Sequence, residues 1–309
     1  MMRQHCYSQP DDLYRAQAAL TQWTREAGDC NYLHKGDVGH QLFNTCYGYD
    51  KDEVFRYWQD DAGELVAFAI LAPHWEFFTL QVAPGLRGSA EHAAIFERCE
   101  RETLRLAKLF NCRLKDLYVE ACDCDPAYIA FVEARGYERD KHGITLTRHD
   151  LKYLPDAELP SGFRFHEATA ADIDRLTELH NHTFTDKWSA ATYAKVLNAP
   201  HMEREWVVVA PDGRFAAFTN LWVDHVNRSL LFEPVGAHSD FRRQGLAKAL
   251  MVYALRRMQT EQGIKCAYVG HEPADKNPAS GALYASVGFK PLFEIYDFKK
   301  SIGHDARSF

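Results

Sequence analysis

The chain has 309 residues, a hydrophobic share of 46% and a formal net charge of −7. This length suits two domains of about 150 residues, and the hydrophobic share is sufficient for a core. The negative charge argues against a nucleic-acid partner, no apolar run approaches the roughly 18 residues of a membrane span, and the first residues contain no apolar segment typical of a secretory signal. We therefore expect a cytoplasmic protein, in which the eight cysteines do not form the disulfide framework of an exported protein.

Apolar periodicity and turn residues divide the first half of the chain into alternating strands and helices. The first expected helix is bounded by Gly28, and the turn Asp60-Asp61-Ala62-Gly63 indicates a hairpin. In chain order we expect a helix over 10–27, a loop or short helix over 31–44, strands over 53–59, 65–72 and 76–82, a long helix to about 110, a strand over 114–121 and a helix over 126–134.

The second half repeats this order. Arg242 corresponds to Arg87 at an offset of 155 (242 minus 87), and Gly288 corresponds to Gly136 at an offset of 152 (288 minus 136). Two anchors with similar offsets indicate a tandem duplication. The expected elements are strands over 163–168, 205–210, 215–224, 230–237, 266–270 and 291–298, and helices over 171–184, 190–198, from 246 onward and over 278–286.

A segment with two prolines separates the copies, a composition suited to a linker. We therefore predict a first domain over 1–150, a linker over 151–161 and a second domain over 162–309.

A basic turn between a strand and a helix in the second copy has the features of an anion site. The strand ends at Ala237, and Arg242-Arg243-Gln244-Gly245-Leu246-Ala247 leads into the helix. The first N–H groups of a helix have no internal partner, and the small residues Gly245 and Ala247 leave room for a phosphate. Neither the P-loop motif nor the dinucleotide motif is present, so binding of a nucleoside triphosphate or of a dinucleotide loses its main support in the sequence.

A second motif follows at Asn277-Pro278-Ala279-Ser280-Gly281-Ala282-Leu283-Tyr284-Ala285-Ser286-Val287-Gly288-Phe289. Together with Arg242-x-x-Gly245-x-Ala247, it resembles the acetyl-CoA-binding and catalytic motifs of the GNAT acetyltransferases, over roughly residues 162 to 300. The resemblance implies an α/β (α+β) fold of two tandem GNAT-like domains, each a mixed, mostly antiparallel sheet flanked by helices. The layout is similar to that of mycothiol synthase.

The two copies differ at the positions that the resemblance makes important. The first copy has Ala90 and His92 where the second has Gly245 and Ala247. It also has Asp125 and Val132 where the second has Asn277 and Tyr284. Larger side chains would crowd a phosphate, and valine cannot donate a proton. We therefore expect a degenerate first domain and a catalytic second domain.

The resemblance implies that acetyl-CoA is the co-substrate and that a small primary amine is the acceptor, with no nucleic acid, membrane or metal involved. The family fold places the pantetheine beside the backbone of strand 230–237 and the pyrophosphate at the basic turn. The expected contacts to acetyl-CoA are Val235, Ala237, Arg242, Arg243, Gln244, Gly245, Leu246, Ala247 and Asn277.

Direct transfer of an acetyl group needs a base for the amine and an acid for the leaving sulfur. The resemblance makes Tyr284 the candidate acid. Leu231 stands where several family members carry a glutamate, so the base is open: Glu233 is the first candidate, and His271 and Glu272 are in reserve. An outward charge on the strand is an equally simple reading of Glu233.

The leading hypothesis is an acetyl-CoA-dependent N-acetyltransferase. The alternative is a non-catalytic regulatory or scaffold protein that binds acyl-CoA. The sequence also contains Cys122-Asp123-Cys124, which lacks a second ligand pair at zinc spacing and is interpreted as an inert thiol pair.

Overall fold

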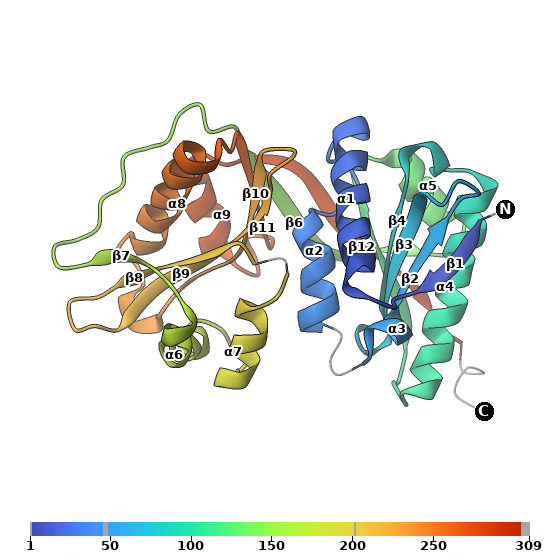
Figure 1. Cartoon of the computed structure of the whole chain (residues 1–309), viewed down its shortest axis with the longest axis horizontal. Helices are drawn as coiled ribbons and strands as arrows, with labels where there is room; N and C mark the ends of the chain where they lie inside the picture. Colours follow the sequence, from blue (N-terminus) through green and yellow to red (C-terminus); the bar gives the residue numbers. More distant parts are fainter. Residues whose placement is uncertain (1, 46–48, 201, 304–309) are drawn as a thin grey trace. The chain divides into compact units, whose positions relative to one another are not determined.

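The computed structural model of the chain describes residues 2–45, 49–200 and 202–303. Its contacts define two compact units, Met1–Ile144 with Phe293–Phe309, and Thr145–Leu292. Each unit is a mixed, mostly antiparallel sheet with helices on its two faces, so the predicted fold class is confirmed (Figure 1). The last six residues of the predicted second domain lie outside the described residues.

The first unit has the strand order β1-β2-β3-β4-β5-β12. All of its neighbouring strands run antiparallel except β4 and β5, which are parallel. Its strands are β1 (Arg3–Cys6), β2 (Phe55–Gln59), β3 (Leu65–Ala72), β4 (Phe77–Val82), β5 (Asp116–Cys122) and β12 (Lys290–Ser301). Its helices are α1 (Pro10–Ala27), α2 (Lys35–His40), α3 (Lys51–Val54), α4 (Ala90–Leu109) and α5 (Pro126–Glu133), with a π-helical turn at Gln41–Thr45 and 3₁₀ turns at Pro73–Trp75 and Pro84–Leu86.

The residues of β3 show how this sheet is covered on both faces. Phe68 and Ile70 pack with α1 and α2, whereas Ala67, Ala69 and Leu71 pack with α4 and α5. Successive side chains of a strand point to opposite faces, so an unbroken apolar run indicates burial on both.

The second unit has the order β6-β11-β10-β9-β8-β7, and its only parallel pair among the described strands is β10 with β11. The strands are β6 (Glu138–His149), β7 (Arg164–Glu167), β8 (Arg204–Val209), β9 (Phe215–Asp224), β10 (Ser229–Ala237) and β11 (Cys266–His271). The helices are α6 (Ile173–Thr183), α7 (Ala190–Leu197), α8 (Leu246–Gln262) and α9 (Pro278–Val287), with 3₁₀ turns at Ala170–Asp172 and Ser239–Phe241.

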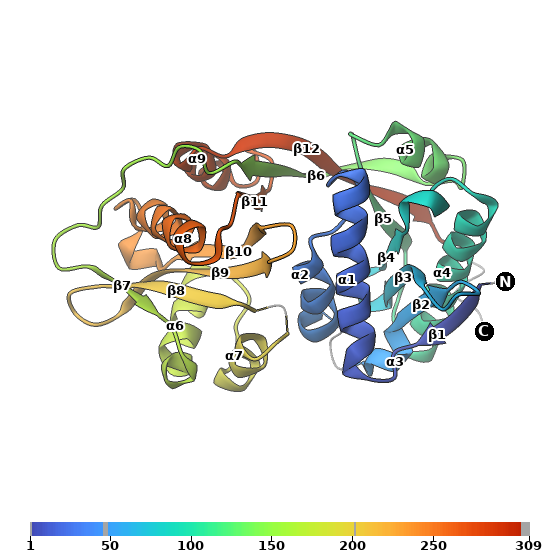
Figure 2. The ribbon, with the colours of Figure 1, turned by 45° about the horizontal axis from the view of Figure 1, so that its top comes forward.

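In this unit α8 covers one face of the sheet, and α6 and α7 cover the other (Figures 1 and 2). The alternating residues of β9 again serve the two faces: Phe218 packs with α6 and α7, and Ala217 packs with α8 and α9. The segment predicted as a linker has no helix or strand over 151–160, but Leu154, Ala157 and Leu159 pack against the α8 side of the core.

Two strands make the units differ from the predicted division of the chain. Thr145–His149 of β6 pairs with β11, and Ile295–Ser301 of β12 pairs with β5. Residues 293–303 therefore belong to the first unit, and residues 145–161 belong to the second. The last strand of each sheet comes from the other half of the chain, which the order of elements along the sequence does not reveal.

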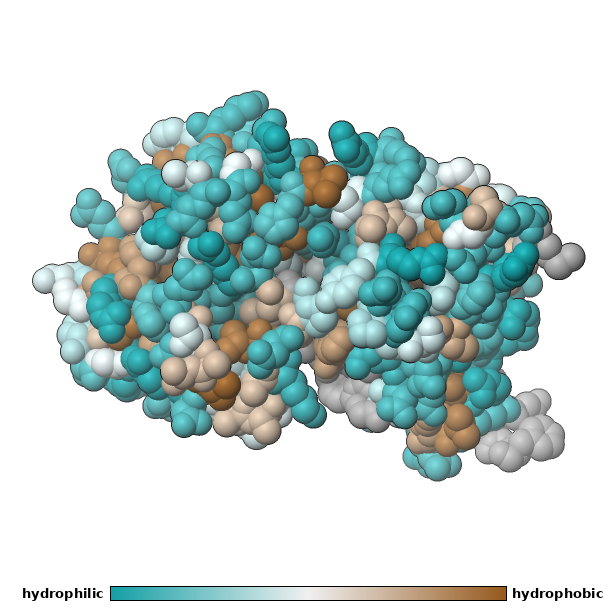
Figure 3. Space-filling model, in the orientation of Figure 1, coloured by the Kyte–Doolittle hydropathy of each residue, from teal (hydrophilic) through white to brown (hydrophobic). Residues whose placement is uncertain are grey.

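Within the described part of the chain, no helix is both long and apolar enough to cross a membrane. The face drawn in Figure 3 is mostly hydrophilic. Large exposed apolar side chains belong to separate elements, for example Tyr14 on α1, Trp75 after β3 and Val226 after β9. Scattered side chains of this kind are normal on a protein surface.

Candidate active site

The site is built around the divergence of two parallel strands. Among the described residues, β10 and β11 pair only over Ser229–Leu231 and Cys266–Tyr268. Beyond this point β10 pairs only with β9, and a bulge interrupts that pairing between Phe232 and Val235. The edge of β10 that faces β11 therefore carries unpaired backbone groups, available to an extended ligand.

The turn that follows β10 forms a concave surface of N–H groups. Arg243 has φ +67° and Gly245 has φ +75°, and α8 begins at the next residue, Leu246. Left-handed residues in a turn direct successive N–H groups to one side, which creates an anion site. No side chain caps α8, and a Cβ on Gly245 would meet nothing within 4 Å, so this surface is open.

The side chain of Arg242 stabilises this turn through two hydrogen bonds. Its guanidinium donates to the carbonyl of Thr183 at 3.0 Å and to the carbonyl of Ala237 at 3.4 Å. Val235 and Ala237 lie on β10, and Gln244 is exposed, whereas Leu246 is buried in the core and Ala247 is half-buried. The residues predicted to bind the pyrophosphate therefore lie together in one turn. However, the side chain of Arg242 is engaged in hydrogen bonds within the protein, and the side chain of Leu246 is packed in the core.

Asn277 lies at the start of α9 with an exposed side chain. Its side chain makes no capping hydrogen bond to the helix. The amide is therefore available to a ligand.

Glu233 and Tyr284, the predicted base and acid, influence each other electrostatically. Glu233 lies in the bulge of β10, is partly buried, and makes no hydrogen bond or ion pair with another described residue. Burial raises the pKa of Glu233 to about 7. Tyr284 is 7% exposed, and burial, followed by the charge of Glu233, raises its pKa far above 10. The two side chains are thus electrostatically coupled, although they come from different elements.

The ring of His271 lies near the ring of Tyr284, with centroids 6.2 Å apart. Its Nδ1 is 2.8 Å from the carbonyl oxygen of Glu272, which only accepts, so Nδ1 carries the proton and Nε2 is left as an acceptor. A Cβ on Gly281 would lie 3.1 Å from the His271 ring, so this glycine lets α9 approach it. His271 and Glu272, the two reserve bases, are neighbours in sequence. The hydrogen bond to the Glu272 carbonyl and the contact with Gly281 fix the orientation of the His271 ring.

A second buried carboxyl was not singled out from the sequence. Glu205 on β8 is 2% exposed, accepts from the hydroxyl of Tyr193, and burial raises its pKa to about 8. It stands opposite Asn220 of β9, and one oxygen of each side chain has no hydrogen-bond partner. Because a protonated carboxyl donates, a Glu205 proton directed at Asn220 would satisfy both oxygens. Its signal in the sequence is a lone acid in an apolar strand, as for Glu233.

Glu178, His182 and His238 are close enough to suggest a metal, since their donor atoms lie within 4.8 Å of one another. However, the rings of His182 and His238 are stacked, with centroids 4.2 Å apart and an interplanar angle of 17°, so their lone pairs lie in two nearly parallel planes. The Nδ1 of His238 also accepts the N–H of Asp240, which leaves the proton on Nε2. This geometry does not converge on an ion.

The corresponding turn of the first unit is closed by its own side chains. The N–H of Gly88 donates to Nδ1 of His92, and the N–H of His92 donates to Ser89. Burial holds the pKa of His92 at about 4, so its ring is neutral and accepts. The N–H groups that are open in the second unit are therefore occupied here.

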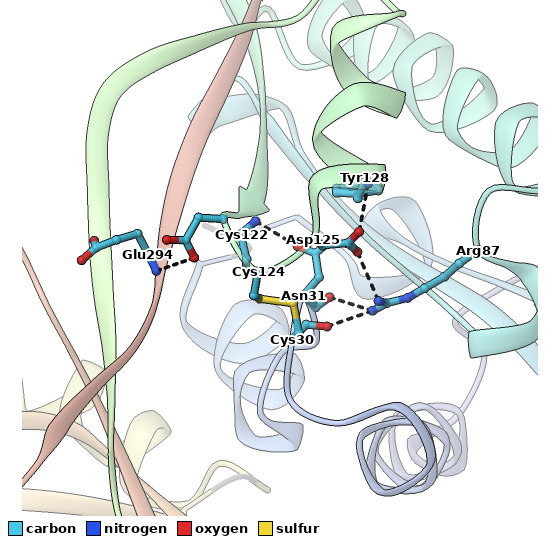
Figure 4. The surroundings of a disulfide bond; sticks show 9 residues. Cys30, Asn31, Arg87, Cys122, Cys124, Asp125, Tyr128 and Glu294 are labelled. Atoms are coloured by element: carbon cyan, nitrogen blue, oxygen red, sulfur yellow. Dashed lines mark hydrogen bonds and ion pairs between the residues drawn. A yellow bond between two sulfur atoms is a disulfide. The ribbon is translucent and has the colours of Figure 1, made fainter.

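The first unit also fills the gap between its parallel strands. β4 and β5 pair only at Phe77 and Tyr118. Beyond that point lies the segment 30–33, in which Tyr32 donates to the carbonyl of Val82 and Asn31 accepts the N–H of Cys122. A Cys30–Cys124 disulfide anchors this segment (Figure 4), so the prediction of an inert thiol pair at 122–124 was wrong for Cys124. Cys122 is a buried free thiol.

Divergent parallel strands followed by an open anion-binding turn offer backbone groups to a ligand with an extended arm and a phosphate. Residues 173–289 match the model of the acetyltransferase (GNAT) family. The second unit, within which this match lies, therefore resembles the GNAT acetyltransferases. No curated protein matches the sequence.

Solved structures with the same fold cover both units. A tandem GNAT protein from the clavulanic acid biosynthesis pathway has 17% identity and a TM-score of 0.68, with 98% of this chain and 99% of that chain covered. A GCN5-related N-acetyltransferase from Sphaerobacter thermophilus has 14% identity and a TM-score of 0.65, with 97% and 95% covered. N-myristoyltransferase from Saccharomyces cerevisiae has 12% identity and a TM-score of 0.60, with 97% and 79% covered. At these identities the likeness establishes the tandem fold.

Proposed function

We propose that the second unit transfers the acetyl group of acetyl-CoA to a primary amine of a small molecule by direct attack on the thioester. The observation that carries this proposal is the coupling of Glu233 with Tyr284 where β10 and β11 diverge. The pKa of Glu233 is raised to about 7, and the pKa of Tyr284 is raised far above 10. This combination supplies a base and an acid at pH 7.

The residues of the second unit fit the proposed co-substrate. The free edge of β10 at Val235 and Ala237 would pair with the amides of the pantetheine. The open N–H groups over 243–247 would hold the pyrophosphate, with the dipole of α8 behind them. The free amide of Asn277 would add a polar contact near the start of α9.

In this proposal acetyl-CoA supplies an acetyl group activated as a thioester. Glu233 accepts one proton from the ammonium of the acceptor, so that its nitrogen gains a lone pair and attacks. Tyr284 gives its proton to the leaving sulfur, and the second proton of the nitrogen restores it. The net products are an amide, a thiol and one proton released to solvent. Side chains on a helix lean toward its N-terminus, which directs Tyr284 toward the open end of β10.

We also propose that only the second unit binds acetyl-CoA. The support comes from the first unit, where His92 and Ser89 take the N–H groups of the turn. The segment 30–33 takes the backbone groups at the ends of β4 and β5. An acyl-CoA would have to displace both sets of contacts.

The test is the release of free thiol from acetyl-CoA in the presence of a panel of primary amines. Each amine is matched with its N,N-dimethyl analogue, which has the same charge but cannot yield a stable amide. The proposal expects release with some primary amines and none with their analogues. Tight binding of acetyl-CoA without amine-dependent release across the panel would favour the regulatory or scaffold alternative.

A further inference from the structure

The Cys30–Cys124 disulfide of the first unit joins two loops that are 94 residues apart in sequence. Cys30 follows α1, and Cys124 lies between β5 and α5 (Figure 4). Cys124 is exposed and Cys30 is partly buried. A small molecule in solution therefore reaches the sulfur of Cys124 first.

The disulfide adds a covalent link to a segment that is also held by hydrogen bonds and by the packing of Tyr32 in the core. Asn31 accepts the N–H of Cys122 at 3.2 Å and donates to Asp125 at 3.2 Å. The hydroxyl of Tyr32 donates to the carbonyl of Val82 at 3.0 Å. Asn31 also has φ +62°, a left-handed conformation that costs free energy unless its surroundings enforce it. Breaking the covalent link removes one of the constraints that enforce it.

The charged residues next to the two cysteines are mostly acidic. Cys124 stands between Asp123 and Asp125, and Asp123 accepts the N–H of Glu294. Asp29 precedes Cys30, and the guanidinium of Arg87, which donates to the carbonyl of Cys30 at 3.2 Å, also forms an ion pair with Asp125 at 3.3 Å. Negative charge at the exposed sulfur repels anionic thiols and favours cationic ones.

The nearest free thiol does not compete for this reaction. Cys122 is two residues from Cys124 but is 5% exposed, and burial raises its pKa to about 12. The thiolate is the nucleophile in exchange, so Cys122 stays inert at neutral pH.

We propose that the Cys30–Cys124 disulfide is a site of exchange with small cationic thiols, and that its opening releases the segment 30–33 from the gap between β4 and β5. In the first step the thiolate of an aminothiol attacks Sγ of Cys124, the protein disulfide breaks, and Cys30 leaves as a thiolate. Cys124 then carries a mixed disulfide. A second aminothiol attacks the aminothiol sulfur of that bond and frees Cys124, so two thiols are oxidised to one disulfide while the protein disulfide is reduced.

The experiment exposes the oxidised full-length protein to cysteamine, which is cationic, or to mercaptoethanesulfonate, which is anionic, at equal thiolate concentration. Mass spectrometry follows the mixed disulfide on Cys124, and hydrogen exchange follows the peptides that contain Asn31–Leu33 and Cys122. We expect faster reaction with cysteamine, with loss of exchange protection in both peptides as Cys124 is modified. Equal or faster reaction with the anionic thiol, or modification that leaves protection unchanged, would overturn the proposal.

Two variants complete the test. Cys6→Ser removes an exposed free thiol on β1 and should change neither the reaction nor the protection. The double variant Cys30→Ser/Cys124→Ser should show the unprotected peptides without any thiol. A double variant that folds and keeps the protection of the oxidised protein would contradict the role of the disulfide as the anchor.

Discussion

Replacing Tyr284 with phenylalanine removes the proposed acid and little else. The ring of Tyr284 packs against His271 and Phe289 with centroid distances of 6.2 and 6.3 Å, and phenylalanine preserves both contacts. The hydroxyl has no hydrogen-bond partner among the described residues, so its loss leaves no buried group unsatisfied. We therefore expect the free energy of unfolding to change by about 1 kcal/mol or less.

The effect on catalysis should be much larger. A positioned general acid contributes roughly 10²–10⁴ in rate, which corresponds to about 3–5 kcal/mol in the activation free energy. Burial and the charge of Glu233 keep the pKa of Tyr284 far above 10, so the hydroxyl is protonated at every assay pH and the loss should not depend on pH.

The assay measures kcat from thiol release at saturating acetyl-CoA, together with binding of acetyl-CoA and thermal unfolding. Tyr253→Phe is the matched control, because Tyr253 packs on α8 against Phe165 in the same unit. A Tyr284→Phe enzyme that folds, binds acetyl-CoA and turns over within about threefold of the parent would refute the reasoning, since solvent would then protonate the sulfur.

Three further changes test other parts of the structure. Glu233→Gln should lower the rate by about 10² and abolish the rise of kcat/KM with pH through about 7, and an unchanged pH profile would transfer the role of base to another group. Glu205 has a pKa of about 8 in the folded chain against an ordinary 4.5, so the free energy of unfolding should fall by up to roughly 5 kcal/mol as the pH rises between these values. Glu205→Gln should flatten that dependence in urea unfolding, and a variant with the same slope would contradict a buried proton. A Cβ on Gly236 would lie 2.5 Å from Thr183, so Gly236→Ala should lower the free energy of unfolding by about 1–3 kcal/mol. The control Gly85→Ala should not lower it, because a Cβ there would meet nothing within 4 Å. Equal effects of the two substitutions would contradict tight packing at Gly236.

Local signals in the sequence located the candidate site. Pro278 begins α9 and Gly288 ends it with φ +112°, so the position of Tyr284 on the helix followed from its neighbours. The basic turn before α8 was identified in the same way. These features depend on residues within about one or two helical turns of each other, which sequence patterns describe well.

Features that depend on distant parts of the chain were not predictable. β6 pairs with β11 of the second unit, and β12 pairs with β5 of the first unit. Strand pairing, and not the order of elements along the chain, therefore decides to which unit each strand belongs. The burial of Glu205 depends on Asn220 of another strand. The Cys30–Cys124 bond joins loops 94 residues apart. The cytoplasmic location stays a prediction, and in such a reducing compartment the proposed exchange would keep this bond open.

The central claim is that one acyl-CoA site per chain lies in the second unit, and titration calorimetry with acetyl-CoA tests it most directly. We expect one site per chain, lost in Gly245→Glu, where bulk and negative charge enter the anion-binding turn. Gly88→Glu is the matched control, since Gly88 has φ +74° and equally open space, and it should leave binding intact. Two equivalent sites per chain, or a Gly88→Glu variant that folds but loses binding while Gly245→Glu retains it, would contradict the account.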